Sequence, residues 1–166
     1  MAEDEPVSRL IAALSDTSID VRHEAIRKLA AQKDAIPALI AALATASGKE
    51  TRWYLATTLS QAGRPVVAPL LAAMKGNADP EFRRYAAAAL GGIGEPAVEP
   101  LIGALSADDR GLRGFISLAL CRIGKAAVAP LSRRLDDPDE IIRSCASLTL
   151  WQMGEGGVPE LVRKAE

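Results

Sequence analysis

Residues 83–105 read RRYAAAALGGIGEPAVEPLIGAL, and residues 113–135 read RGFISLALCRIGKAAVAPLSRRL. The two stretches share one order of charged, apolar and glycine positions, and they begin 30 residues apart. Self-similarity at a fixed spacing of about 20 to 50 residues is typical of repeat architectures, in which each unit packs on its neighbours. These stretches therefore indicate the fold class, and the rest of the chain can be compared with their spacing.

The same spacing runs through the whole chain in three series. One arginine recurs in each unit, at Arg22, Arg52, Arg83, Arg113 and Arg143. A leucine follows each of them, at Leu29, Leu59, Leu90, Leu120 and Leu150. A VxPL-like stretch opens each unit, at Val7, Ile36, Val67, Val98, Val128 and Val158. We expect one domain over residues 1–166, with repeats at 7–35, 36–66, 67–97, 98–127 and 128–157 and a cap at 158–166.

Each repeat carries the start and stop signals of two helices. Proline stands near the start of the first helix, where its missing N–H costs nothing, and none is expected in a helix interior. A capping side chain precedes the second helix in four units, and a glycine suited to a left-handed C-cap ends it in four. The sequence predicts an all-α, right-handed α-α superhelix of five helical hairpins plus a C-terminal capping helix.

The composition excludes several broad classes. The chain has 166 residues, 49% of them hydrophobic, and a net charge of −1. No overall basic field would attract nucleic acid or an anionic membrane, and no apolar run reaches the roughly 20 residues that span a bilayer. The acidic start, MAEDEPVSRL, does not have the pattern of a secretory signal, and two cysteines are no disulfide framework. These features favour a cytoplasmic protein.

Residues able to do chemistry are few. His23 is the single histidine, and one histidine cannot supply a metal site of the usual kind. The repeat register keeps Cys121 and Cys145 too far apart for a disulfide, and neither has a histidine partner. The five in-register arginines are best explained as structural residues that bond turn carbonyls or an acid of the next hairpin. We therefore predict no catalytic residues, no metal and no cofactor.

The repeat also resembles a known family. The pattern D-x-x-x-R-x-x-A-A-x-A-L-x-x-I-G, followed by A-V-x-P-L-I-x-A-L, stands here as DPEFRRYAAAALGGIG-EPAVEPLIGAL. It is similar to the short HEAT-like repeat of the phycobilisome-lyase type, from about Val7 to the end of the chain. The resemblance implies a solenoid whose second helices line the concave side. Such repeats serve lyases, hydroxylases and scaffolds alike, so the resemblance implies no single function.

One stripe of the second helices varies from unit to unit and should line that concave side. At about 100° per residue, it holds the positions one, two, five and nine after each arginine. Aromatic side chains occupy the second position in three consecutive units, and an aromatic and two arginines lie near them. The predicted binding residues are Trp53, Tyr54, Arg84, Tyr85, Phe115 and Arg122. We expect the aromatic residues among them to form a ladder along the groove.

Three functions fit these features. The first is a non-enzymatic protein–protein interaction module whose concave groove takes a segment of another protein. The alternative, implied by the resemblance, is a phycobilin lyase-like subunit that binds a tetrapyrrole between aromatic residues and arginines. A DNA-binding HEAT-like protein fits less well, because acidic residues stand beside the arginines of the groove. Self-association through the ends of the solenoid also stays open.

Overall fold

The computed structural model describes residues 5–154, and that range is built from helices and short turns without a strand. The first helices of the repeats are α1 (Val7–Ala13), α3 (Ile36–Thr45), α5 (Val67–Gly76), α7 (Val98–Ala104) and α9 (Lys125–Ser132). The second helices are α2 (Ile19–Ala30), α4 (Lys49–Ala62), α6 (Pro80–Ile93), α8 (Arg110–Ile123) and α10 (Glu140–Gln152). The predicted cap at 158–166 lies outside the described residues.

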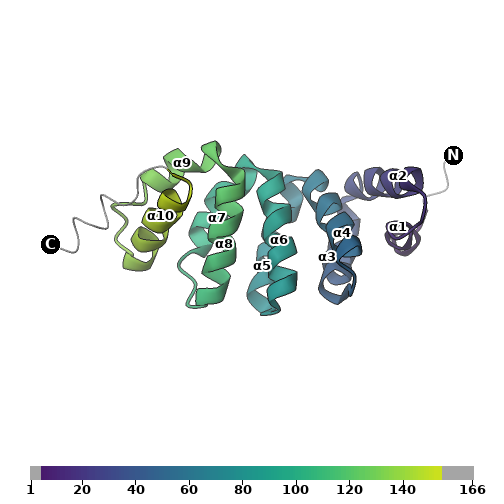
Figure 1. Ribbon diagram of the computed structural model, residues 1–166, viewed down its shortest axis with the longest axis horizontal. Helices are drawn as coiled ribbons and strands as arrows, with labels where there is room; N and C mark the ends of the chain where they lie inside the picture. Colours follow the sequence, from purple (N-terminus) through teal and green to yellow (C-terminus); the bar gives the residue numbers. More distant parts are fainter. Residues whose placement is uncertain (1–4, 155–166) are drawn as a thin grey trace.

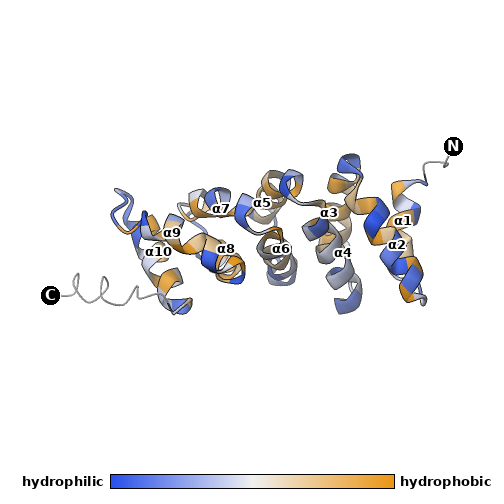
Figure 2. Ribbon diagram, turned by 90° about the horizontal axis from the view of Figure 1, so that it is seen from above, coloured by the Kyte–Doolittle hydropathy of each residue, from blue (hydrophilic) through white to orange (hydrophobic). Residues whose placement is uncertain are grey.

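The hairpins stack side by side into an elongated array (Figure 1). Each second helix packs against the next, from α2 to α10, and these contacts are more extensive than those between successive first helices. In the view from above, α3, α5 and α7 lie along one long side and α4, α6 and α8 along the other (Figure 2). Closer packing of the second helices is the arrangement expected on the inner side of a curved array. The predicted all-helical solenoid is confirmed.

Side-chain caps fix where most of the second helices begin. In four of them the residue before the helix accepts a hydrogen bond from a free backbone N–H of the first turn. The capping residues are those predicted, Ser18, Asp79, Asp109 and Asp139. The exception is Gly48 before α4, which has no side chain to offer.

The helix-ending glycines have positive φ, but they are not in the left-handed helical conformation. The φ angles of Gly63, Gly94 and Gly124 are 77°, 83° and 75°, and their ψ angles are −144°, −140° and −131°. This region mirrors extended backbone and is open only to glycine. The sequence predicted the residue and the sign of φ correctly, whereas the predicted left-handed C-cap is wrong.

Pro130 departs from the expected placement of proline. Pro69 and Pro100 are third residues of α5 and α7, because a separate 3₁₀ turn precedes each helix. In the fifth repeat that turn continues as α-helix, so α9 begins directly after Gly124 and encloses Pro130. The expectation that no proline lies inside a helix is therefore wrong at this position.

The core lies between the two rows of helices. The five repeated leucines are at most 2% exposed, so the leucine series of the sequence marks the core. In α6, Phe82, Ala86 and Leu90 are 1%, 0% and 0% exposed. Small buried side chains such as Ala87 and Ala89 let the neighbouring helices approach closely on both sides of α6.

The in-register arginines hold the turns between helices, as predicted. Four of them donate a hydrogen bond to the carbonyl oxygen six residues earlier, at N–O distances of 2.5 to 2.8 Å. Three members of the series approach an acid of the next hairpin. These ion pairs are Arg22–Glu50 at 3.8 Å, Arg52–Glu81 at 3.6 Å and Arg83–Asp109 at 2.6 Å. Four members of the series thus bond their own turn, and Arg22, Arg52 and Arg83 lie close to an acid of the next unit.

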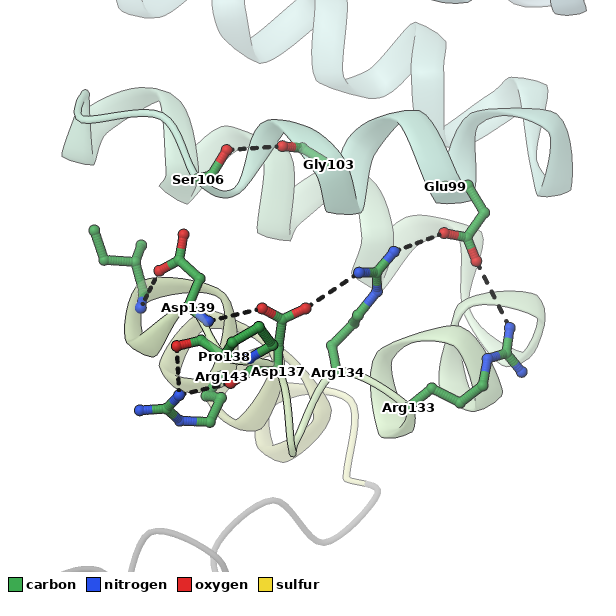
Figure 3. A network of polar contacts seen from close by, with 10 residues as sticks. Glu99, Gly103, Ser106, Arg133, Arg134, Asp137, Pro138, Asp139 and Arg143 are labelled. Carbon is green, nitrogen blue, oxygen red and sulfur yellow. Dashed lines mark hydrogen bonds and ion pairs between the residues drawn. The ribbon is translucent and has the colours of Figure 1, made fainter.

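A separate polar network joins the last two repeats (Figure 3). Glu99 of α7 pairs with Arg133 at 3.6 Å and with Arg134 at 3.3 Å, and Arg134 pairs with Asp137 at 3.2 Å. The backbone N–H of Asp139 and the Arg134 guanidinium hold the pKa of Asp137 below its usual range. Most of these side chains are partly exposed, so the network orients the turn more than it stabilises it.

Candidate binding groove on the second helices

Four of the six predicted binding residues line one open groove over α4, α6 and α8. Its volume is about 530 Å³, and Trp53, Arg84, Tyr85 and Arg122 contribute to its walls. The remaining walls come from small and polar side chains and one leucine, namely Ala56, Thr57, Ser60, Gln61, Ala88, Gly92 and Leu118. We call this surface the arginine groove.

Phe115 faces a neighbouring depression between α8 and α10. This depression, the Phe115 hollow, has a volume of about 480 Å³ and is lined by Gly111, Gly114, Phe115, Leu118, Cys121 and Gln152. Leu118 belongs to both surfaces, so the arginine groove and the Phe115 hollow adjoin across α8. No side chain that lines the hollow carries a charge at neutral pH.

Tyr54 lines neither surface. Its ring meets the Trp53 ring edge-on, with centroids 5.0 Å apart and planes at 81°. The Arg22 guanidinium carbon lies 5.0 Å from the centre of the same ring. Tyr54 is therefore packed between Arg22 and Trp53, and it supports the exposed Trp53 ring at the end of the groove.

The three aromatic residues of the second position are in register, but their rings do not touch one another. Tyr54, Tyr85 and Phe115 are half-buried at equivalent places on α4, α6 and α8. Within residues 5–154, however, the Trp53–Tyr54 pair is the one contact between aromatic rings. Helix axes about 8–10 Å apart exceed the roughly 4.5–7 Å at which ring centroids interact. Trp53, which is 56% exposed, is the most accessible of the four aromatic residues.

Two adjacent glycines in α6 shape the groove. A Cβ at Gly91 would lie 2.7 Å from Cβ of Arg122 and 3.1 Å from its Cδ, so the aliphatic part of Arg122 packs directly on α6. A Cβ at Gly92 would lie 2.2 Å from Oγ of Ser60. Because both glycines lack a side chain, α4 and α8 approach α6 closely and Arg122 lies across the groove.

We expect Gly91→Ala to destabilise the protein although alanine favours helix. The gain in helix propensity is about 1 kcal/mol, whereas forcing a methyl group into a packed contact costs about 1–3 kcal/mol. The Cβ of Arg122 cannot rotate away from the new methyl group, so α8 must move. Urea denaturation should show a net loss of up to about 2 kcal/mol, and Gly103→Ala, where a new Cβ meets no atom within 4 Å, should show none. A stability raised as much as in Gly103→Ala would contradict the packing described for Arg122.

The acidic side chains on this face are paired with basic ones, whereas the groove itself is lined by two arginines and no acid. On the same face, Glu24 pairs with Arg27 and Lys28, Glu50 approaches Arg22, and Glu81 approaches Arg52 and Arg84. Arg122 has no acidic partner among residues 5–154, and no aspartate or glutamate lines the arginine groove. The acidic residues of this face are thus engaged within the protein, while the groove itself carries two exposed guanidinium groups.

The groove also contains Leu118 and Ser60, which are not among the six predicted binding residues. Leu118 lies on the variable stripe, at the fifth position of its unit, where the other units have arginine, threonine, alanine or leucine, and it is 45% exposed. An exposed leucine on a variable stripe indicates a binding surface, as the exposed aromatic residues do. Ser60, at the eighth position, enters the groove only because Gly92 leaves room beside it.

The other residues that could act as nucleophiles or metal ligands have no catalytic or metal-binding partner nearby among the described residues. His23 is exposed on α2, and the half-buried Cys121 and Cys145 are free thiols whose pKa is raised by burial. Among the described residues, no three His, Cys, Asp or Glu side chains gather as they would around a metal ion. In that same range, no helix combines the length and apolarity that crossing a bilayer requires.

Comparison with known proteins agrees with the repeat geometry. The model of the HEAT repeats family matches residues 7–76 and 67–151. The chain belongs to the HEAT-repeat family. The match does not extend to the phycobilisome-lyase type within it, so that finer resemblance stays a prediction. Among curated protein sequences, none matches this HEAT-repeat chain.

Solved structures similar to this HEAT-repeat chain include engineered repeat proteins. An engineered protein from a structural genomics consortium is 22% identical over 95% of this chain and 84% of its own, with a TM-score of 0.37. A designed armadillo repeat protein in complex with a (KR)4 peptide is 17% identical over 96% of this chain and 91% of its own, with a TM-score of 0.36. A computationally designed armadillo repeat protein for modular peptide recognition is 18% identical over 95% of this chain and 91% of its own, with a TM-score of 0.33.

Proposed function

We propose that this HEAT-repeat protein is a non-enzymatic binding module that takes a segment of another protein in the arginine groove. The observation that supports this most directly is the grouping of Trp53, Arg84, Tyr85 and Arg122 around one open surface. Tryptophan, tyrosine and arginine are the residue types enriched where truncation most weakens protein interfaces.

The exposed apolar side chains on this face support the same proposal. Trp53, Leu118 and Leu148 are 56%, 45% and 44% exposed, and they stand at variable positions of α4, α8 and α10. Large apolar residues that stay exposed next to one another mark interaction surfaces in soluble proteins. The buried leucine stripe already supplies the core, so the fold does not need these side chains on the outside.

We expect Tyr85→Ala to weaken partner binding by about 2 kcal/mol, or roughly 30-fold in Kd. Tyr85 lies on α6 in the middle of the arginine groove, and truncation removes its ring from the centre of the interface. The partner would be captured from the native source with the wild-type protein, identified by mass spectrometry and titrated by calorimetry. Stability in urea should change much less than in a core variant, because Tyr85 is half-buried.

The matched control is Arg64→Ala, which alters an exposed residue outside the groove, in the turn before α5. This control should bind the partner as the wild type does. Equal affinity of the wild type and Tyr85→Ala, combined with loss of binding in Arg64→Ala, would place the interface on another face. Saturable binding of biliverdin, with no protein partner, would favour the tetrapyrrole-binding role instead.

A further inference from the structure

We propose that the occupant is an extended segment carrying one acidic residue and, about three residues away, one large apolar residue. The acidic side chain pairs with Arg84 and Arg122 in the arginine groove, and the apolar side chain enters the Phe115 hollow. This inference rests on the proposed function and specifies the chemistry of the partner.

The acidic residue follows from charge complementarity. Arg84 and Arg122 are exposed on the walls of a groove that contains no acidic side chain. Arg84 has one competitor, Glu81 at 3.1 Å, but Glu81 also approaches Arg52 and both members of the pair are solvent-exposed. Arg122 has no acidic partner in the described part of the chain and is held in place by its contact with Gly91. A guanidinium group on the wall of such a groove can bind a carboxylate with short, charge-assisted hydrogen bonds, and both Arg84 and Arg122 line this one.

The apolar residue follows from the Phe115 hollow. Phe115 and the exposed Leu118 supply apolar walls, and Gly114 adds no side chain to the lining. A Cβ at Gly114 would meet no atom within 4 Å, so the space above it is open. An apolar side chain placed there would remove Phe115 and Leu118 from water without desolvating a charge.

The spacing follows from the repeat. The two surfaces adjoin across one helix, and neighbouring helix axes lie about 8–10 Å apart. An extended chain advances about 3.3 Å per residue, so about three residues separate the two contacts. A helical occupant advances only about 1.5 Å per residue and would need about six. The spacing therefore distinguishes an extended segment from a helix.

A displayed library of random 12-residue peptides, selected on the full chain, tests this inference. Selected peptides should be enriched in aspartate or glutamate with a large apolar residue about three positions away. Their affinities can be measured by tryptophan fluorescence in a Trp151→Phe background, where Trp53 is the remaining tryptophan. The double variant Arg84→Gln/Arg122→Gln should weaken binding at least about tenfold, and the wild-type affinity should fall with added salt.

Two matched variants separate a local effect from one of net charge. Arg84→Lys/Arg122→Lys keeps both charges and should retain more affinity than the glutamine pair. Arg9→Gln/Arg64→Gln removes two exposed arginines outside the groove and should bind as the wild type does. Equal losses in this pair and in the groove pair would overturn the inference, because net charge alone would then explain the effect.

The remaining outcomes distinguish this inference from the proposed function. Selected peptides that need Trp53 and Tyr85 but carry no acidic residue, or that bind the glutamine pair normally, would overturn the inference and leave the proposed function standing. Acidic and apolar residues about six positions apart would exclude the extended form. A library that yields no peptide sensitive to groove replacements would overturn both.

Discussion

Leu90→Ala is expected to lower the free energy of unfolding by about 2–5 kcal/mol. Leu90 is fully buried in the central repeat, on the helix whose contacts with both neighbouring second helices are the most extensive in the described array. Alanine removes three carbon atoms from a tightly packed site, and the cost grows with the cavity that the surroundings fail to fill. Urea denaturation followed by far-UV circular dichroism measures the loss.

The matched control for this prediction is Leu29→Ala in the first repeat. Leu29 occupies the same repeat position and is also fully buried, so the chemistry of the change is identical. Within the described residues the first repeat packs on one neighbouring repeat, and in a stacked array each interface adds to stability. Leu29→Ala should therefore cost less than Leu90→Ala. Equal losses, or a larger loss in Leu29→Ala, would show that the central units do not hold the array together.

The fold could be predicted from the sequence because several signals repeat together. The leucine series marks the core, the capping residues mark the helix starts, and the glycines mark the ends. Each signal reflects a local requirement that recurs in every unit, so five copies confirm one another. Deviations in a single unit were harder to foresee. Pro130 lies inside α9 because the turn before it is helical in that repeat alone.

The site could be predicted only in part, for a different reason. Periodicity assigns a residue to a face, and Trp53, Arg84, Tyr85 and Arg122, which share a face by periodicity, line one groove in the structure. It does not show which small residues let neighbouring helices approach. Gly91 and Gly92 make the room that positions Arg122 and Ser60, and such contacts between units depend on distances that one sequence does not contain. For the same reason Tyr54 was assigned to the groove, although it packs under Trp53.

Arg83→Met is expected to lower the free energy of unfolding by about 3 kcal/mol. The Arg83 side chain is 5% exposed, which is lower than that of Arg22 or Arg52 in the arginine series. Its Nε donates to the carbonyl oxygens of Met74 and Asn77, at 3.1 and 2.8 Å, and its Nη2 donates to Asp109 at 2.6 Å. Methionine has a similar length and preserves the packing, but it leaves these carbonyls without their donor. Losing hydrogen bonds from a charged donor costs about 1.5–3 kcal/mol each, and the better burial of methionine offsets part of this.

The acid dependence of stability gives Arg83→Met a second, independent measurement. The hydrogen bond from Arg83 is the largest cause that holds the pKa of Asp109 below its usual value of 3.8, followed by the backbone N–H of Leu112. A carboxyl whose pKa is lowered on folding stabilises the folded protein when the pH is above the carboxyl's pKa in the unfolded chain. This contribution is lost as the pH falls through the lower pKa of the folded protein. In Arg83→Met the pKa of Asp109 should rise toward 3.8, so stability should fall less steeply below about pH 4 than in the wild type.

Arg143→Met is the matched control, since Arg143 holds the same repeat position in α10. Its guanidinium bonds the carbonyls of Asp137 and Pro138 but, within residues 5–154, forms no ion pair with an acid of a following hairpin. Its side chain is also less buried than that of Arg83, so water can replace the lost donor at these carbonyls. Arg143→Met should therefore cost less than Arg83→Met. Equal losses in the two variants, or an Arg83→Met protein with the acid profile of the wild type, would show that the Arg83–Asp109 pair does not link the third and fourth repeats.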